Sequence, residues 1–200
     1  DDVMDEVREQ AERDYQLASG LSQDVETDDN VFRQTTARLP WLLIGMLGGI
    51  GNSMILGNFD STFAAHPEMA LYIPLIGGTG GNVGTQSSAL VVQGLANSSL
   101  NAENTFKQVL KESVVALINA TIISMLVYIY NFIRFGATAT VSYSVSISLF
   151  AVVMFASIFG TLVPMTLEKL KIDPAIATGP FISITCLLYT SPSPRDPKTS

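Results

Sequence analysis

The feature that most constrains this chain is residues 72–89, a glycine-rich stretch that contains no charged side chain. It lies within a longer uncharged run, residues 69–102, which exceeds the roughly 20 residues that a membrane-spanning helix needs. Its middle nevertheless contains Asn82, Thr85 and Gln86, whose polar groups lipid cannot satisfy. We therefore expect a membrane helix with one face turned to protein or water.

Two interpretations of this helix remain open. At helical spacing Gly78, Asn82 and Gln86 fall on one stripe, and a polar stripe on a membrane helix suggests a pore lining. The alternative is a helix–helix contact sealed by amide hydrogen bonds and by glycines that let backbones approach closely. Those glycines form the pairs Gly77/Gly81 and Gly80/Gly84. The run is also longer than one crossing needs, which predicts a tilted helix or an interruption around residues 77–81.

Composition extends this interpretation to the whole chain. Hydrophobic residues make up 48% of the sequence and charged residues only 14%, which is too apolar for an ordinary soluble domain. Eleven of the 18 acidic residues lie in the first 29 positions, so long uncharged stretches follow. We expect an all-α fold: a polytopic helical membrane protein with four complete transmembrane helices and a truncated fifth, preceded by a cytoplasmic amphipathic connecting helix. The expected spans are residues 41–59, 70–97, 113–133, 145–167 and, incomplete, 174–189.

The lysines and arginines between these spans predict the orientation of the chain. On one side the basic residues are Arg33, Arg38, Lys107, Lys111, Lys169 and Lys171. The opposite side has only Arg134. The positive-inside rule therefore places the N-terminus in the cytoplasm of a multi-pass protein of the cell membrane.

The first forty residues differ in character from the rest. Residues 1–17 predict a charged helix, residues 18–30 predict an acidic linker, and residues 31–39 predict a short amphipathic helix that ends at Pro40. The acidic run from Asp24 to Asp29 is interpreted as a solvated connection, with weak binding of divalent cations as the alternative. Because the chain opens in a helical pattern without a starting methionine, we expect it to be a piece of a longer protein.

The sequence contains no credible catalytic constellation, so we do not expect an enzyme. His66 and Cys186 are the single histidine and cysteine, and they are interpreted as a loop residue and a small apolar helix residue. The glycine cluster lacks the lysine of a Walker loop, and the pattern G-x-G-x-x-G breaks at Val83. There is no basic patch of the kind that binds nucleic acid.

What remains is a membrane site built from neutral oxygens and amides. Such a site suits a hard cation that keeps much of its water, as Mg²⁺ does, because a hydration shell can be hydrogen-bonded by backbone carbonyls and amide side chains. A neutral site alone selects poorly for a divalent ion. We therefore expect a carboxylate at or near the pore, yet the expected spans contain none.

Several motifs resemble MgtE-type magnesium transporters, over about residues 1–186. Gly-Thr-Gly-Gly-Asn-Val-Gly-Thr-Gln at residues 78–86 resembles the second membrane helix of that family, and Arg-Leu-Pro-Trp-Leu-Leu at residues 38–43 resembles its first. Asp-Pro-Ala-Ile-Ala-Thr-Gly-Pro-Phe at residues 173–181 is similar to the start of its fifth helix. Asp-Asp-Val-Met-Asp-Glu-Val at residues 1–7 is similar to the last helix of a CBS domain pair, which precedes a connecting "plug" helix.

The resemblance implies a homodimer in the lipid bilayer, in which helices two and five of both subunits line one path for hydrated Mg²⁺. Mg²⁺ would be both the transported and the regulatory ion, sensed in the cytoplasm by CBS domains that close the path through the plug helices. Residues 1–20 would be the end of the CBS domain, residues 21–40 the linker and plug helix, and residues 41–189 the transmembrane domain. By motif position the lining residues are Gly78, Asn82, Gln86, Ile176, Gly179 and Ser183. The implied Mg²⁺ contacts are Asn82, Asp173 and Asp14.

One departure from the family concerns Leu187, which occupies the position of its pore aspartate. Residues 187–200 contain three prolines, so the fifth helix cannot complete its crossing, and residues 190–200 are expected to be a non-native tail. We therefore expect the natural full-length protein to transport Mg²⁺ and this chain to conduct poorly, with uptake restored by aspartate at position 187 and a full fifth helix. A non-conducting helical scaffold and a transporter of a neutral organic solute remain as alternatives.

Overall fold

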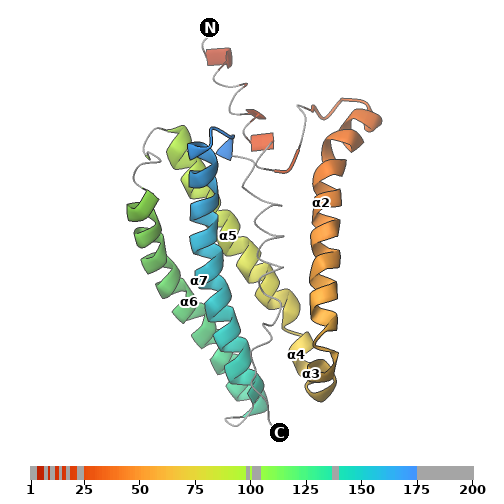
Figure 1. Cartoon of the computed structure of the whole chain (residues 1–200), viewed down its shortest axis with the longest axis vertical. Coiled ribbons are helices and arrows are strands. Elements are labelled where there is room, and N and C mark those ends of the chain that lie inside the picture. Colours follow the sequence, from red (N-terminus) through yellow and green to blue (C-terminus); the bar gives the residue numbers. More distant parts are fainter. Residues whose placement is uncertain are drawn as a thin grey trace.

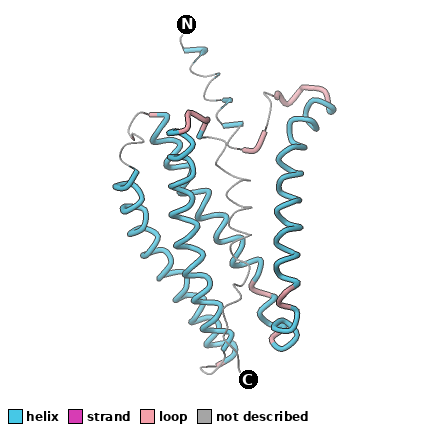
Figure 2. Tube along the Cα trace, in the orientation of Figure 1, coloured by secondary structure: helices cyan, strands magenta, loops and turns pink. Residues whose placement is uncertain are grey.

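All the regular structure in the described part of the chain is helical (Figures 1 and 2). The computed structural model describes residues 4–6, 9, 12–13, 15–16, 19–21, 25–97, 100, 105–136 and 140–174. The elements are α2 (Val31–Gly57), α3 (Asp60–Ala65), α4 (Pro67–Ala70), α5 (Ile73–Ala96), α6 (Thr105–Phe135) and α7 (Thr140–Lys169). Of these, α2, α6 and α7 are long and apolar enough to cross a membrane. The predicted all-α class is thus confirmed for the described residues. Of the four complete spans that the sequence predicted, three have such a helix, and α5, at the second, is not among them. The expected fifth span lies beyond the described residues except at its start.

The first long helix, α2, begins at Val31, where the connecting helix was expected to begin, but it does not end at Pro40. Asn30 caps it, because the Asn30 side chain accepts a hydrogen bond from the Phe32 amide at 3.2 Å and satisfies a donor of the first turn. The helix then continues through Pro40 to Gly57, so the expected connecting helix and first span form one element. The proline removes one backbone donor, which a long membrane helix tolerates.

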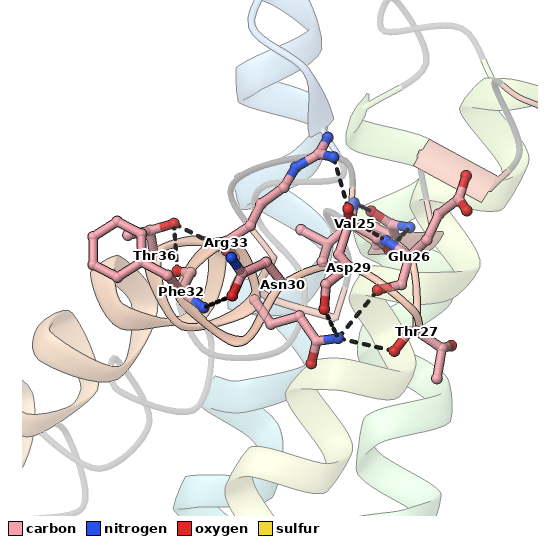
Figure 3. A network of polar contacts seen from close by, with 10 residues as sticks. Val25, Glu26, Thr27, Asp29, Asn30, Phe32, Arg33 and Thr36 are labelled. Atoms are coloured by element: carbon pink, nitrogen blue, oxygen red, sulfur yellow. Dashed lines mark hydrogen bonds and ion pairs between the residues drawn. The ribbon is translucent and has the colours of Figure 1, made fainter.

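The acidic residues before α2 are organised around its first turn (Figure 3). Asp29 forms an ion pair with Arg33 at 2.8 Å and also accepts a hydrogen bond from the Glu26 amide. The side-chain amide of Gln34 donates to the backbone carbonyls of Glu26, Thr27 and Asp29 at 3.0–3.3 Å. These contacts favour the interpretation of the described part of this segment as a structural connection, because the Asp29 carboxylate already has an ion-pair partner and a hydrogen-bond donor.

The connection between α2 and α5 is mostly helical, although His66, which was interpreted as a loop residue, lies between its helices. It contains the short helices α3 and α4, separated by His66. The His66 ring lies 3.2 Å from the Glu68 carboxylate. The pKa of Glu68 is lowered, chiefly by a hydrogen bond from its own backbone amide and further by His66. Two half-exposed polar residues therefore form this corner.

Helix α7 is central to a three-helix bundle, because α5 and α6 both pack along it (Figure 1). The core contains Ala120 of α6 with Leu149 and Val153 of α7, and Ile76 and Val83 of α5 pack against this cluster. The opposite face of α6 carries large exposed apolar side chains. Examples are Ile118, Ile122, Met125 and Leu126. Such a surface suits contact with acyl chains.

Helix α2 stands beside this bundle rather than within it (Figure 1). Its first residues, the last residues of α5, the first of α6 and the last of α7 all lie at the same end of the molecule (Figure 1). The helix termini that carry Arg33, Lys107 and Lys169 are therefore grouped at this end. Arg134 follows in the last turn of α6, at the other end. This arrangement is the one that the charge distribution predicted for the spans.

Candidate functional site

Helix α5 is continuous, and its two faces have different surroundings. Of the two alternatives for its excess length, a tilt or an interruption around residues 77–81, the interruption is absent, since the helix runs from Ile73 to Ala96 with Pro74 in its first turn. One face is buried, and α5 packs along α7. The buried residues are Gly77, Gly80, Gly81, Gly84, Ser87, Ser88 and Val91. Small side chains on this face allow the two helices to approach closely.

Gly160 of α7 marks a point of close approach. A Cβ atom at this position would lie 2.5 Å from the carbonyl oxygen of Gly84 and 3.1 Å from Cβ of Ser87. Real Cβ atoms do not come so near to backbone atoms, so glycine is required here for α7 to cross α5. The glycine pair 80/84 that the sequence singled out thus lies on the face of α5 that is buried in the bundle.

The polar stripe lies on the other side of α5. Gly78, Asn82 and Gln86 are exposed, and a Cβ atom at Gly78 would meet nothing within 4 Å. Neither Asn82 nor Gln86 makes a hydrogen bond to another described residue. The two interpretations of the sequence therefore apply to different faces of one helix: glycines seal the contact with α7, and the amides are left open on the opposite face.

A buried carboxylate lies where three helices meet. Glu112 of α6 is only 9% exposed. Its Oε1 accepts a hydrogen bond from the Ser87 hydroxyl of α5 at 2.6 Å and from the Ser157 hydroxyl of α7 at 2.5 Å. The two hydroxyl oxygens are themselves 3.0 Å apart. Glu112 thus connects α5, α6 and α7 through a compact group of oxygens in the interior.

Glu112 was not among the residues that the sequence singled out, because the expected third span excluded it. The third span was expected to begin at Ser113, because a charged residue was taken as its boundary. In the structure α6 starts at Thr105, two turns earlier, and carries Glu112 into the bundle. The Glu112 partners Ser87 and Ser157 gave no distinct signal, because both α5 and α7 carry several other serine and threonine residues.

A cavity of about 600 Å³ adjoins this group. It lies between α5 and α6, with Ser157 of α7 among its lining residues. Both helices pack on α7, and the cavity occupies the space that separates them. Gln86 belongs to its lining as well as to the exposed stripe, so the cavity reaches the edge of that stripe.

Several predicted site residues lie outside the described residues and are not placed by the structure. They are Asp14, Ile176, Gly179, Ser183 and Leu187. Asp173 is described and exposed, and it follows α7 at the end where Lys169 lies. No group of three or more histidine, cysteine, aspartate or glutamate side chains gathers among the described residues. The described part of the stripe therefore offers amides and backbone, which suit a hydrated ion better than a bare one.

Comparison with known proteins agrees with this geometry. The family model MgtE, described as a divalent cation transporter, matches residues 73–186. The chain is 31% identical over 183 residues to the magnesium transporter MgtE of Bacillus subtilis and 29% identical over 183 residues to that of Enterococcus faecalis. It is 31% identical over 189 residues to the magnesium transporter MgtE of Thermus thermophilus. Each match covers 92% of this chain but only 40–41% of the relative.

The fold and the site define a helical membrane protein in which one glycine-rich helix presents a polar stripe. The family match covers more than half of the chain and includes all of α5, α6 and α7. The chain belongs to the MgtE family of divalent cation transporters. The family is one of transporters and not of enzymes, in agreement with the sequence analysis. The chain spans about two fifths of the length of the relatives it matches.

Proposed function

We propose that this chain forms the membrane part of a Mg²⁺ transporter in which the hydrated ion passes along the exposed stripe of α5. The observation that carries the proposal is the orientation of Asn82 and Gln86, which lie on the face of α5 that the α7 contact leaves open. Lipid cannot satisfy these amides, so their free side requires water or protein. Amide groups can hydrogen-bond the water shell that Mg²⁺ keeps.

A second copy of the chain completes the path in this proposal. A single exposed stripe is half of a lining, and a two-fold related copy supplies the other half by placing the same residues opposite it. Ile176, Gly179 and Ser183 of the fifth helix contribute to the same lining. The basic end of the bundle faces the cytoplasm of a cell membrane protein, and Asp173 lies near this mouth of the path.

Regulation in this proposal comes from the cytoplasmic side. Cytoplasmic Mg²⁺ closes the path through the segment that precedes α2, and Asp14 takes part in holding the ion. The continuity of α2 through Pro40 supports a mechanical link, because a displacement of its first turns is transmitted directly to the membrane portion of the same helix.

Thiol accessibility tests the stripe without requiring the chain to conduct. In a Cys186→Ser background, Asn82→Cys is treated with a charged thiol reagent in proteoliposomes. We expect rapid labelling that Mg²⁺ slows, because only a thiol in water forms the reactive thiolate. The control is Leu126→Cys, at a position that is 62% exposed on the apolar face of α6 and should react slowly. Equally slow labelling at both positions would place the stripe in lipid and refute the proposal.

A further inference from the structure

The cavity between α5 and α6, called here the Glu112 cavity, combines one buried carboxylate with neutral polar side chains. Its volume is about 600 Å³. Six waters at roughly 30 Å³ each need about 200 Å³ with the ion they surround, so a hydrated cation fits inside. Amide side chains line the space, namely Gln86, Gln93, Asn97, Gln108 and Asn119. These groups can accept hydrogen bonds from the waters of a hydration shell.

The Glu112 side chain has no basic partner among the described residues. Its side chain contacts two neutral hydroxyls, both through Oε1. Lys111 lines the same cavity, but no ion pair joins it to Glu112. A buried carboxylate without a cation is costly inside a membrane protein. A positive ion in the adjoining cavity would remove this cost.

We propose that the Glu112 cavity binds a divalent cation through its water shell, with Glu112 supplying the charge and the amides of α5 and α6 supplying hydrogen bonds. The hydrogen bonds to Glu112 determine which of its oxygens can accept from a water of the ion's shell. Ser87 and Ser157 both donate to Oε1, so Oε2 accepts no hydrogen bond from a described residue and is available to water. This site lies within one chain, between α5, α6 and α7, and is separate from a path formed between two copies.

Binding of Mn²⁺ alone to the chain in nanodiscs of zwitterionic lipid tests the proposal. Free Mn²⁺ is counted by its electron paramagnetic resonance signal, and Mg²⁺ is added to displace the bound ion. We expect Glu112→Gln to weaken binding by about tenfold or more, the range for losing a group that acts on the ion through its ligands. Glu168→Gln is the matched control, since Glu168 is exposed in the last turns of α7, at the same end of the bundle.

The outcomes separate this site from the stripe. If Asn82→Ala abolishes Mn²⁺ binding while Glu112→Gln leaves it intact, the ion lies on the stripe and the cavity proposal is overturned. If Glu112→Gln binds Mn²⁺ as the unchanged chain does, the proposal also fails. If Glu112→Gln weakens Mn²⁺ binding and Asn82→Ala leaves it intact, the result supports a site in the Glu112 cavity, whether or not ions move along α5.

A measurement on the unchanged chain covers the case in which Glu112→Gln does not fold. Dicyclohexylcarbodiimide modifies carboxyl groups in apolar surroundings, and mass spectrometry locates the adduct. We expect Mg²⁺, at concentrations that displace Mn²⁺, to slow modification of Glu112 several-fold. Modification of Glu112 at the same rate with and without Mg²⁺ would overturn the proposal.

Discussion

A Cβ atom placed on Gly160 of α7 would lie 2.5 Å from the carbonyl oxygen of Gly84 on α5. The backbone of α5 therefore blocks any side chain at position 160, and it cannot move aside as a flexible side chain would. This contact fixes how α5 lies on α7. It also determines which face of α5 is left open, because the glycine face and the stripe of Asn82 and Gln86 are on opposite sides of the helix.

Gly160→Ala should destabilise the bundle. Overpacking of this kind costs about 1–3 kcal/mol, although alanine is otherwise favoured over glycine in a helix by about 1 kcal/mol. The free energy of unfolding is measured by titrating the chain from a mild detergent into sodium dodecyl sulfate. Gly45→Ala in α2 is the control, because a Cβ atom there meets nothing within 4 Å. Equal stability of the two variants would show that α5 and α7 do not cross as described.

The effect of a substitution at Glu112 on the free energy of unfolding should depend on whether an acceptor oxygen remains. Glu112→Ala removes the oxygen that accepts from Ser87 and Ser157, and each buried donor left unsatisfied costs about 1–3 kcal/mol. Glu112→Gln keeps an acceptor oxygen at the same distance along the side chain, so it should cost less than Glu112→Ala. The same unfolding titration measures both variants.

The exposed Glu168 provides the reference for that comparison. Glu168→Ala should change the free energy of unfolding by no more than about 0.5 kcal/mol, as is usual for surface positions. If Glu112→Ala were as mild as Glu168→Ala, the group of Glu112, Ser87 and Ser157 would not connect the three helices.

The sequence predicted α5 well because its pattern is local. Glycines at spacings of three and four residues and amides at spacings of four define two faces on any helix, and the structure places Gly84 and Asn82 on different sides. Whether that helix is broken could not be judged from residues 77–81. Glycines that lower helix propensity in water are stabilised here by contact with α7, which belongs to a distant part of the chain.

The two errors at span boundaries have a common cause. Pro40 and Glu112 were each taken as the limit of a membrane helix, since proline and charge are both unfavourable inside one. Each is accommodated by its surroundings: Pro40 lies within a long continuous helix, and Glu112 is bonded by hydroxyls from two other helices. Partners that are 25 and 45 residues away along the chain cannot be identified from periodicity.

The end of the bundle that carries Arg134 contains a buried hydrogen bond between two side chains, and its contribution to stability can be tested. Tyr72, just before α5, donates a hydrogen bond at 2.5 Å to Oδ1 of Asn131, which is fully buried on α6. The side-chain nitrogen of Asn131 has no partner among the described residues. Tyr72→Phe should therefore cost about 1–3 kcal/mol, because Asn131 is then left without any side-chain hydrogen bond.

A double-mutant cycle decides whether loss of the hydrogen bond between Tyr72 and Asn131 accounts for the cost of Tyr72→Phe. Asn131→Leu removes both polar groups of the amide, so Tyr72→Phe should cost much less in that background than in the unchanged chain. Unfolding free energies of the four proteins give the coupling. A cost of Tyr72→Phe that is the same in both backgrounds would mean that the tyrosine contributes through packing with Val141 and Val145 instead.

The proposed second copy makes a prediction at Gly78, which is exposed on the stripe and has open space beyond its backbone. In the Cys186→Ser background, Gly78→Cys should be joined into covalent dimers by a short bismaleimide, because a two-fold axis along the stripe brings equivalent residues close to one another. Ile122→Cys, 53% exposed on the lipid-facing side of α6, should give far fewer dimers under the same conditions. Gel electrophoresis in detergent measures the yield. Cross-linking that is equal at the two positions would reflect random collisions in the membrane. The proposal that a second copy of the chain faces the stripe would then be wrong.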